Sequence, residues 1–172
     1  MNLQALYKIS YGLYIITSVI ENGGGRKYNG MIANTVFQVS SDPILVAACI
    51  NKENLTHRFI RDSRVFAASI LAKDAPLTFI GRFGFRSGRD YDKFQGINYR
   101  IGKTGAPIVL DNTVAYVEVR VLKEMDVNSH TLFVGEVVDA DVLDDREVMT
   151  YEYYHFIKGG KSPKTATVYL QD

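Results

Sequence analysis

Apolar and polar residues alternate with a period of two over much of this chain. The alternation is clearest over residues 115–122, where valines occupy every second position and Glu118 and Arg120 lie between them. Successive side chains of a β-strand point to opposite faces, so this pattern predicts a half-buried strand. Four more segments, rich in β-branched, aromatic or other apolar residues, are also predicted to be strands: 12–20, 27–40, 44–50 and 131–143.

Turn signals separate these predicted strands. The three glycines at 23–25 predict a hairpin loop, because glycine adopts a positive φ without steric cost. Ser41-Asp42-Pro43 predicts a turn. Gly135 lies inside the last predicted strand, where it indicates a bulge or a close approach of another backbone.

The helices predicted from the sequence are few and short. Residues 3–9 predict a first helical turn. Asn54 is placed to cap a second helix that runs through Ile60, and Asp74 to cap a third that begins near Pro76. The elements together predict a mainly β domain with short peripheral helices.

The composition is that of an ordinary folded domain. Its 172 residues are 47% hydrophobic and 23% charged, without a repeat or an obvious linker, so we expect a single domain over residues 1–172. Closing the sheet into a barrel would remove its exposed edges. The net charge of +1 provides no basic field for nucleic acid or an anionic membrane. We find neither an apolar run of about 20 residues nor a secretory signal, so we expect a cytoplasmic protein.

Motifs of several common catalytic and nucleotide-binding sites are missing. His57, His130 and His155 do not have HExxH spacing, so no metal site is predicted. The absence of GxSxG and GxGxxG disfavours a serine nucleophile and a Rossmann nucleotide domain. The glycines at 23–25 precede a strand and lack the Lys-Ser/Thr pair of a P-loop. Cys49 is interpreted as a buried structural thiol because it lies in an apolar run without an adjacent base.

Two polar segments interrupt the apolar pattern. Residues 29–35 place small and amide side chains in a strand, which either let a flat ligand approach the backbone or form a polar strand face. Residues 51–57 gather a cation, amides and a hydroxyl at the start of a predicted helix, where an anion such as phosphate is favoured. Helix capping by Asn54 or Thr56 explains part of this second pattern but not Lys52.

Two further segments are candidates for ligand contacts. The loop 81–94 mixes arginines, a lysine, glycines and aromatic residues, which suits a nucleotide phosphate and a planar ring, or simply a solvated basic surface. Residues 128–136 form a polar turn that leads into a strand. His130 at the strand start either donates a hydrogen bond to a ligand or has a structural role.

These segments, taken together, resemble a known family. NGMIANTVFQVSSDP at 29–43, NKENLTH at 51–57, GFRSGRDYDKF at 84–94 and HTLFVGEV at 130–137 resemble the flavin reductase-like family of FMN-binding split barrels, and the resemblance continues through 149–166. It implies a six-stranded antiparallel Greek-key split β-barrel with short peripheral helices. It also implies a homodimer with FMN near the subunit interface.

The resemblance further implies which residues contact the flavin. The ring would lie against the strand at 29–35, the phosphate against 51–56, and His130 beside the flavin or the nicotinamide. A tryptophan found in some relatives is missing, so either Phe37 would replace it or the site would be more open, and Tyr153 would pack on the ring together with Tyr154. The full set of cofactor-binding residues implied in this way is Asn29, Ile32, Ala33, Asn34, Thr35, Asn51, Lys52, Asn54, Thr56, Ser87, Lys93, His130 and Tyr154.

The implied activity is that of an FMN-dependent oxidoreductase. NADH or NADPH would deliver hydride to N5 of FMN, and electrons would pass to free flavin, ferric iron, O₂ or a redox protein such as rubredoxin. The flavin supplies this chemistry, so no catalytic side chain is expected. Two alternatives stay open: a flavoredoxin-like electron carrier that a partner protein reduces, and a cofactor-free β-barrel interaction module.

Overall fold

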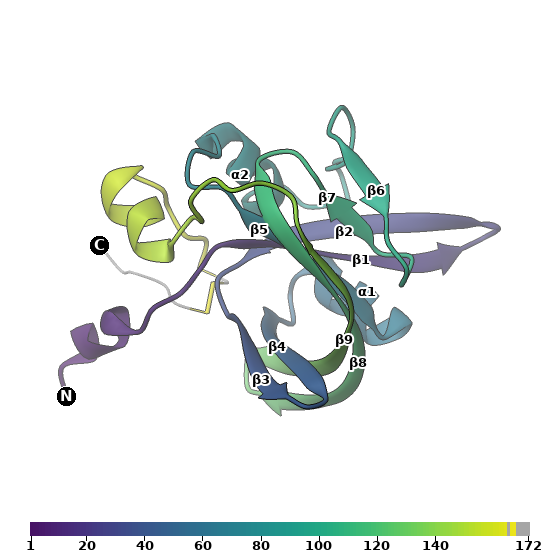
Figure 1. Cartoon of the computed structure of the whole chain (residues 1–172), viewed down its shortest axis with the longest axis horizontal. Coiled ribbons are helices and arrows are strands. Elements are labelled where there is room, and N and C mark those ends of the chain that lie inside the picture. The colour runs from purple at the N-terminus through teal and green to yellow at the C-terminus, as the bar shows by residue number, and fades with distance from the viewer. Residues whose placement is uncertain (165, 168–172) are drawn as a thin grey trace.

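The structure is a computed structural model that describes residues 1–164, 166 and 167. Its centre is a seven-stranded antiparallel sheet (Figure 1). The strands lie in the order β2-β1-β5-β8-β9-β4-β3. Their bounds are β1 Tyr14–Asn22, β2 Gly25–Ala33, β3 Val36–Ser41, β4 Ile44–Asn51, β5 Val65–Leu71, β8 Thr113–Val127 and β9 His130–Val142. A separate ribbon pairs β6 Tyr99–Ile101 with β7 Pro107–Val109.

Short helices surround this sheet. They are the 3₁₀-helix η1 Leu3–Lys8, the α-helices α1 Leu55–Ser63 and α2 Leu77–Gly84, and the π-helix η2 Tyr153–Ile157. Helix α1 packs against β1, and α2 packs against β2. Figure 1 shows η1 and η2 together on the side of the molecule opposite the β1–β2 hairpin turn.

The sheet is rolled into a barrel. Strands β2 and β3 lie at opposite edges of the strand order, yet only Asn34 and Thr35 separate them in the chain. Two residues span less than about 10 Å, so the two edges must come close together in space. The carbonyl of Thr35 accepts a hydrogen bond of 3.0 Å from the Cys49 amide, which ties this connection to β4.

The long strands β8 and β9 bend around the barrel, as Figure 1 shows. Their pairing register shifts between Val121 and Lys123, opposite Gly135. A Cβ atom on Gly135 would lie 2.3 Å from the carbonyl oxygen of Arg120, so only glycine permits this approach. The close approach predicted at Gly135 is therefore confirmed.

Two of the three apolar clusters in the described part of the chain surround the site. The first fills the barrel and includes Ile16, Phe66 and Phe133, which are fully buried. The second lies between the barrel, α2 and the segment around η2, and it includes Phe83 and Tyr154. The second cluster matters for function because it forms one wall of the main cavity described below.

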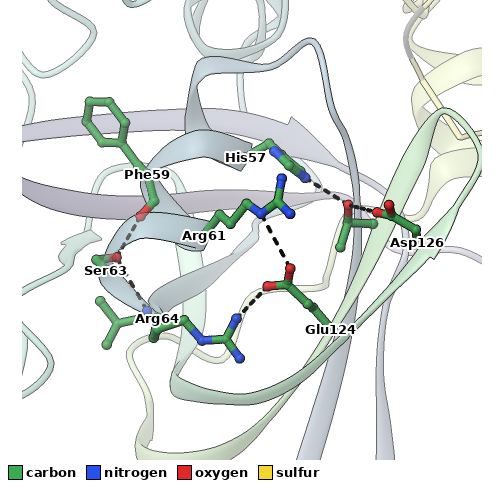
Figure 2. A network of polar contacts seen from close by, with 9 residues as sticks. His57, Phe59, Arg61, Ser63, Arg64, Glu124 and Asp126 are labelled. Carbon is green, nitrogen blue, oxygen red and sulfur yellow. Dashed lines mark hydrogen bonds and ion pairs between the residues drawn. The ribbon is translucent and has the colours of Figure 1, made fainter.

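A polar network holds α1 against the β8–β9 hairpin (Figure 2). The Thr131 hydroxyl donates to the Asp126 carboxylate at 3.1 Å, so it accepts the 2.8 Å hydrogen bond from Nε2–H of His57. Arg61 and Arg64 both pair with Glu124. Burial is the main reason that the pKa of His57 lies below its ordinary value, with a smaller contribution from the cation of Arg61.

The predicted elements agree with the structure in class but not in number. The mainly β fold with short helices is confirmed, whereas the count of six strands is wrong. The strand predicted over residues 27–40 is divided, because β2 pairs with β1 and β3 pairs with β4. Strand β5 was not predicted at all, although its sequence VFAASIL is a short apolar run of strand length.

The predicted helix starts need one correction. Helix α1 begins after Asn54, as expected, but the Asn54 side chain makes no capping hydrogen bond. The N-cap of α2 is Pro76 rather than Asp74, and the Asp74 carboxylate instead pairs with Arg146 at 3.0 Å. In the described part of the chain, no helix has both the length and the apolar character needed to cross a bilayer.

Candidate functional site

An apolar cavity lies where the ends of β2 and β4 meet α2 and the C-terminal segment. It encloses about 620 Å³ of empty space, part of which is open to solvent. Its apolar walls come mainly from Leu13, Met31, Ile32, Ala33, Ile80 and Phe83, and polar groups reach it from Asn34, Asn51 and His130. A concave apolar site with a few converging polar groups is typical of small-molecule binding.

Asn34 carries the clearest sign that this cavity receives a ligand. Its side chain is only 6% exposed, and its Nδ2 atom is buried without a hydrogen-bond partner in the part of the chain that the structure describes. The Thr35 hydroxyl donates to Asn34 Oδ1 at 3.0 Å, which fixes the orientation of the amide and leaves Nδ2 as the unused donor. A buried donor without an acceptor is costly, so a ligand acceptor in the cavity would stabilise it.

A second, polar cavity opens from the apolar one. Its walls combine the first turn of α1 with the loop after α2, and they include Leu55, Thr56, Arg86, Ser87 and Arg89. The two cavities share lining residues, namely Met31, Asn54, Gly84, Phe85 and Pro163. Backbone N–H groups in the first turn of a helix have no acceptor within the helix, and the helix dipole favours an anion there.

Lys93 is buried beside the polar cavity. Its ammonium donates to the carbonyl oxygens of Gly30 at 2.7 Å and of Phe83 at 2.9 Å. It therefore links the flavin-facing strand predicted at 29–35 to the end of α2. Burial lowers the pKa of Lys93 to about 8. Lys93 is also one of the residues that line the polar cavity.

Of the phosphate residues predicted within 51–56, Asn54 and Thr56 line the polar cavity, whereas Asn51 and Lys52 do not. Nδ2 of Asn29 donates to the Thr56 hydroxyl at 2.9 Å, and both residues line the polar cavity. Lys52 lines neither cavity, and its ammonium pairs with Asp126 at 3.1 Å. Asn51 lines the apolar cavity, and its Oδ1 accepts the amide N–H of Glu53 at 2.9 Å.

His130 lies opposite Asn51 in the pairing of β4 with β9, which places both at the apolar cavity. Nδ1 of His130 is 2.9 Å from the Ser129 hydroxyl. Cys49 also reaches this cavity and is only half-buried, so the expectation of a buried thiol is wrong in part. Burial raises the pKa of the Cys49 thiol.

The C-terminal segment forms the remaining wall of the apolar cavity. Tyr154 lines the cavity, and its hydroxyl donates to the carbonyl oxygen of Lys161 at 2.8 Å. Tyr153 instead lies against Lys73, whose ammonium is 5.0 Å from the centre of its ring. Phe37 is 48% exposed on β3 and lines neither cavity, so it does not take the place of a tryptophan there.

Sequence reasoning did not single out Tyr151, which lines the apolar cavity beside Tyr154. It offered the 81–94 loop either to a nucleotide phosphate and a planar ring or to a solvated basic surface, and Arg86 and Arg89 of this loop line the polar cavity. The density of cations in this loop was the available signal, but the sequence does not show which cavity the loop faces.

An apolar cavity and a cavity lined by cations and hydroxyl groups thus adjoin each other within a rolled antiparallel sheet. The family model described as "Flavin reductase like domain" matches residues 6–159. The chain therefore belongs to the flavin reductase-like family, which confirms the resemblance stated from the sequence. The family match and the relatives described below also confirm the predicted activity, which is that of an NAD(P)H-dependent flavin reductase.

The chain is similar to several named proteins. It is 54% identical to a ferric-chelate reductase (NAD(P)H) of Archaeoglobus fulgidus, over 99% of both chains. It is 48% identical to a high molecular weight rubredoxin of Moorella thermoacetica, over 98% of this chain and 72% of that protein. Its structure resembles the NADH:FAD oxidoreductase of Streptomyces globisporus, with a TM-score of 0.74 and 28% identity over 86% of this chain and 85% of that one.

Proposed function

We propose that the chain is an NAD(P)H-dependent flavin reductase that holds FMN with its ring in the apolar cavity and its phosphate in the polar cavity. The observation that carries this assignment is Asn34, which lines the apolar cavity and whose buried Nδ2 donor has no partner in the described residues. Carbonyl oxygens and ring nitrogens along one edge of a flavin ring are acceptors of the kind that this donor needs.

The polar cavity suits the phosphate of FMN. Arg86 and Arg89 contribute positive charge, Ser87 and Thr56 contribute hydroxyl groups, and α1 contributes its N-terminal N–H groups. We propose this set in preference to Lys52, because the Lys52 ammonium is held by Asp126. At the same end of the site, Lys93 links β2 to the end of α2 through its hydrogen bonds to the carbonyls of Gly30 and Phe83.

Bound FMN would accept hydride from NADH or NADPH and pass electrons to an acceptor such as free flavin, a ferric chelate, O₂ or a redox protein like rubredoxin. The protein residues would bind and orient the two partners. Tyr151, Tyr154 and the C-terminal segment shield the apolar cavity from water. His130 is placed to contact the ring or the nicotinamide, and no side chain needs to act as an acid or a base.

We also propose a homodimer that forms next to this site. Register partners in adjacent strands point to the same face, so Phe37, Met125 and Val127 share an outer sheet face with Cys49 and Asn51. The first three side chains are 48%, 55% and 39% exposed. An exposed apolar face of this kind favours association, and this one borders the apolar cavity through Cys49 and Asn51.

The test is a visible spectrum of the FMN-reconstituted protein, recorded anaerobically before and after NADH or NADPH is added. Rapid loss of the flavin absorbance supports a reductase. A flavin that binds but is not reduced by either nucleotide supports the carrier instead. Failure to bind FMN at all would exclude both and favour a cofactor-free module.

The phosphate assignment has its own test. Arg86→Ala should weaken FMN binding about tenfold, because it removes one charge-assisted contact, and should leave riboflavin binding unchanged. Lys52→Ala should leave FMN binding unchanged. Arg58→Ala, which removes an exposed cation on the outer side of α1, is the matched control. Equal losses for FMN and riboflavin in Arg86→Ala would contradict the assignment.

A further inference from the structure

The C-terminal wall of the apolar cavity is a turn that hydrogen bonds hold against η2. The chain reverses at Gly159, whose φ is +67°, and the amide of Gly160 donates to the carbonyl of Tyr154 at 2.8 Å. A Cβ atom on Gly160 would lie 2.3 Å from the ring of Tyr154, so the returning chain lies directly against that ring. The turn brings Ser162 back beside the side chains of η2.

His155 on η2 joins two points of this returning chain. Its Nδ1 is 2.9 Å from the carbonyl oxygen of Gly160, and its Nε2 is 2.9 Å from Oγ of Ser162. A carbonyl oxygen can only accept, so Nδ1 carries the proton of the neutral ring. Burial is the main reason that the pKa of His155 lies below its ordinary value, so the ring is neutral at pH 7 and Nε2 is an acceptor.

The tautomer of His155 sets the direction of a longer chain of hydrogen bonds. Ser162 has one hydroxyl hydrogen, which it donates to Nε2 of His155. The oxygen of Ser162 lies 2.5 Å from the hydroxyl oxygen of Tyr151, so in this contact Tyr151 donates and Ser162 accepts. Tyr151 and Ser162 line the apolar cavity, whereas His155 is half-buried and is not among its lining residues. The chain therefore leads out of the cavity to a titratable ring.

A chain of this composition can conduct a proton. The hydroxyls of Tyr151 and Ser162 each donate and accept, so both links persist when the direction of donation reverses. Tyr154 provides a contrast, because its hydroxyl holds the same segment through the carbonyl of Lys161, which cannot take up a proton. Attachment of the segment therefore does not by itself require a histidine at the end of the other chain.

The proposed reaction leaves a proton to be removed. Hydride transfer itself requires neither an acid nor a base. When one-electron acceptors such as ferric chelates take both electrons of the hydride, the balance is NAD(P)H + 2 Fe³⁺ → NAD(P)⁺ + 2 Fe²⁺ + H⁺. A proton is poorly solvated beside apolar walls, so an acceptor that leads out of the cavity favours its removal.

We propose that Tyr151, Ser162 and His155 form a proton relay that carries this proton from the apolar cavity to solvent. The proposal rests on the proposed function, which supplies the reaction that releases the proton. The oxygen of Tyr151 gains the proton as its own hydrogen passes to Ser162, and the hydrogen of Ser162 passes to Nε2 of His155. The imidazolium then loses one proton to water.

The relay requires a neutral His155. The titratable groups packed against its ring are Tyr151 and Tyr154, whose ring centres lie 4.3 and 5.0 Å away. Burial lowers the pKa of His155 and the hydrogen bond to Gly160 opposes this, while no charged side chain in the described part of the chain shifts it. Acidification that protonates Nε2 should therefore block the relay.

The first test needs no flavin. Nitrogen chemical shifts of the ligand-free protein at pH 7, with the His155 signals assigned by their loss in His155→Gln, should show a protonated Nδ1 and an unprotonated Nε2. Ser162→Ala should shift the Nε2 resonance, because it removes the hydrogen bond to that atom. A ring protonated on Nε2 at pH 7 would overturn the proposal.

The second test separates the two half-reactions by anaerobic stopped-flow spectroscopy of the FMN-loaded protein. Ser162→Ala and Tyr151→Phe should slow reoxidation by a ferric chelate at least about tenfold while changing reduction by NADH or NADPH less than about twofold. Ser162→Thr keeps the hydroxyl and should keep the wild-type rate. Tyr153→Phe, which removes a hydroxyl from the same helix outside the relay, should change neither rate.

The pH profile provides a third readout. Reoxidation of the wild type should slow from pH 7 to pH 5 as His155 becomes protonated, and this dependence should be absent in Ser162→Ala. The proposal is overturned if Ser162→Ala is reoxidised at the wild-type rate, or if it slows reduction and reoxidation equally, which would make the chain purely structural. If neither nucleotide reduces the flavin of the wild type, the proposed function itself fails.

Discussion

Lys93 makes the stability of this protein depend on pH in a way that a single substitution can isolate. Lys93 is 5% exposed, and among the described residues its ammonium donates to two neutral acceptors, the carbonyls of Gly30 and Phe83. Burial lowers its pKa to about 8 from an ordinary value of 10.5. Between these two pH values the unfolded chain binds more protons than the folded one, so the contribution of Lys93 to stability increases as pH rises.

The size of the effect follows from the two pKa values. Integrated from pH 7.5 to 9.5, the lysine should raise the free energy of unfolding by about 2 kcal/mol. Below pH 8 the buried ammonium lowers the free energy of unfolding by its full amount, about 3 kcal/mol. Lys93→Met cannot titrate, so the free energy of unfolding of the wild type minus that of Lys93→Met should increase by about 2 kcal/mol over this range.

Urea denaturation of the two proteins at several pH values measures this difference. Other groups that titrate in the same range are present in both proteins and cancel in the subtraction. A difference that is constant with pH would refute the reasoning and would mean that Lys93 is solvated. Bound FMN should flatten the pH dependence, because a phosphate near the third N–H of Lys93 favours the ammonium and raises its pKa.

Three further predictions concern other buried groups. Glu118 is fully buried on β8 and accepts hydrogen bonds from Lys103 and Thr104, so Glu118→Gln should lower the free energy of unfolding by about 2 kcal/mol in urea titrations. The pKa of His57 is lowered by burial, so on acidification from pH 7 to 5 the wild type should lose more stability than His57→Gln, measured by thermal unfolding. A Cβ on Gly88 would lie 1.9 Å from Oδ1 of Asn29, so Gly88→Ala should weaken FMN binding about tenfold in fluorescence titrations.

Each of these has a control. Glu136→Gln removes an exposed carboxylate from β9 and should cost less than about 0.5 kcal/mol, so an equal loss in both glutamate variants would contradict the role of Glu118. Gly25→Ala adds a Cβ into open space and should leave FMN binding unchanged. Parallel pH profiles for the wild type and His57→Gln would show that His57 titrates normally in the folded protein.

The local patterns of the sequence were sufficient for most elements but not for their pairing. Alternation identified β8 and β9, and the glycines at 23–25 identified the turn between β1 and β2, because both signals act over a few residues. The division of residues 27–40 into β2 and β3 was not visible. Both halves have strand-like composition, and only their different partners separate them.

The same distinction applies to the site. Of the residues predicted to contact the flavin ring, Ile32, Ala33, Asn34 and His130 line the apolar cavity. Lys52 had equally good chemistry for phosphate, yet its ion pair with Asp126 depends on where the β8–β9 hairpin lies. Arg86 and Arg89 reach the polar cavity only because the loop after α2 packs beside the first turn of α1.

The sequence by itself determined the periodicity, the turns, the mainly β class and, through its resemblance, the family and the kind of cofactor. These depend on short-range sterics and on residue types, which one chain displays directly. Only the tertiary structure decided which cations line the cavities and that Lys93 is buried between two carbonyls. Those properties depend on distances between segments far apart in the chain, and such distances are fixed only when the sheet rolls up and the loops pack against it.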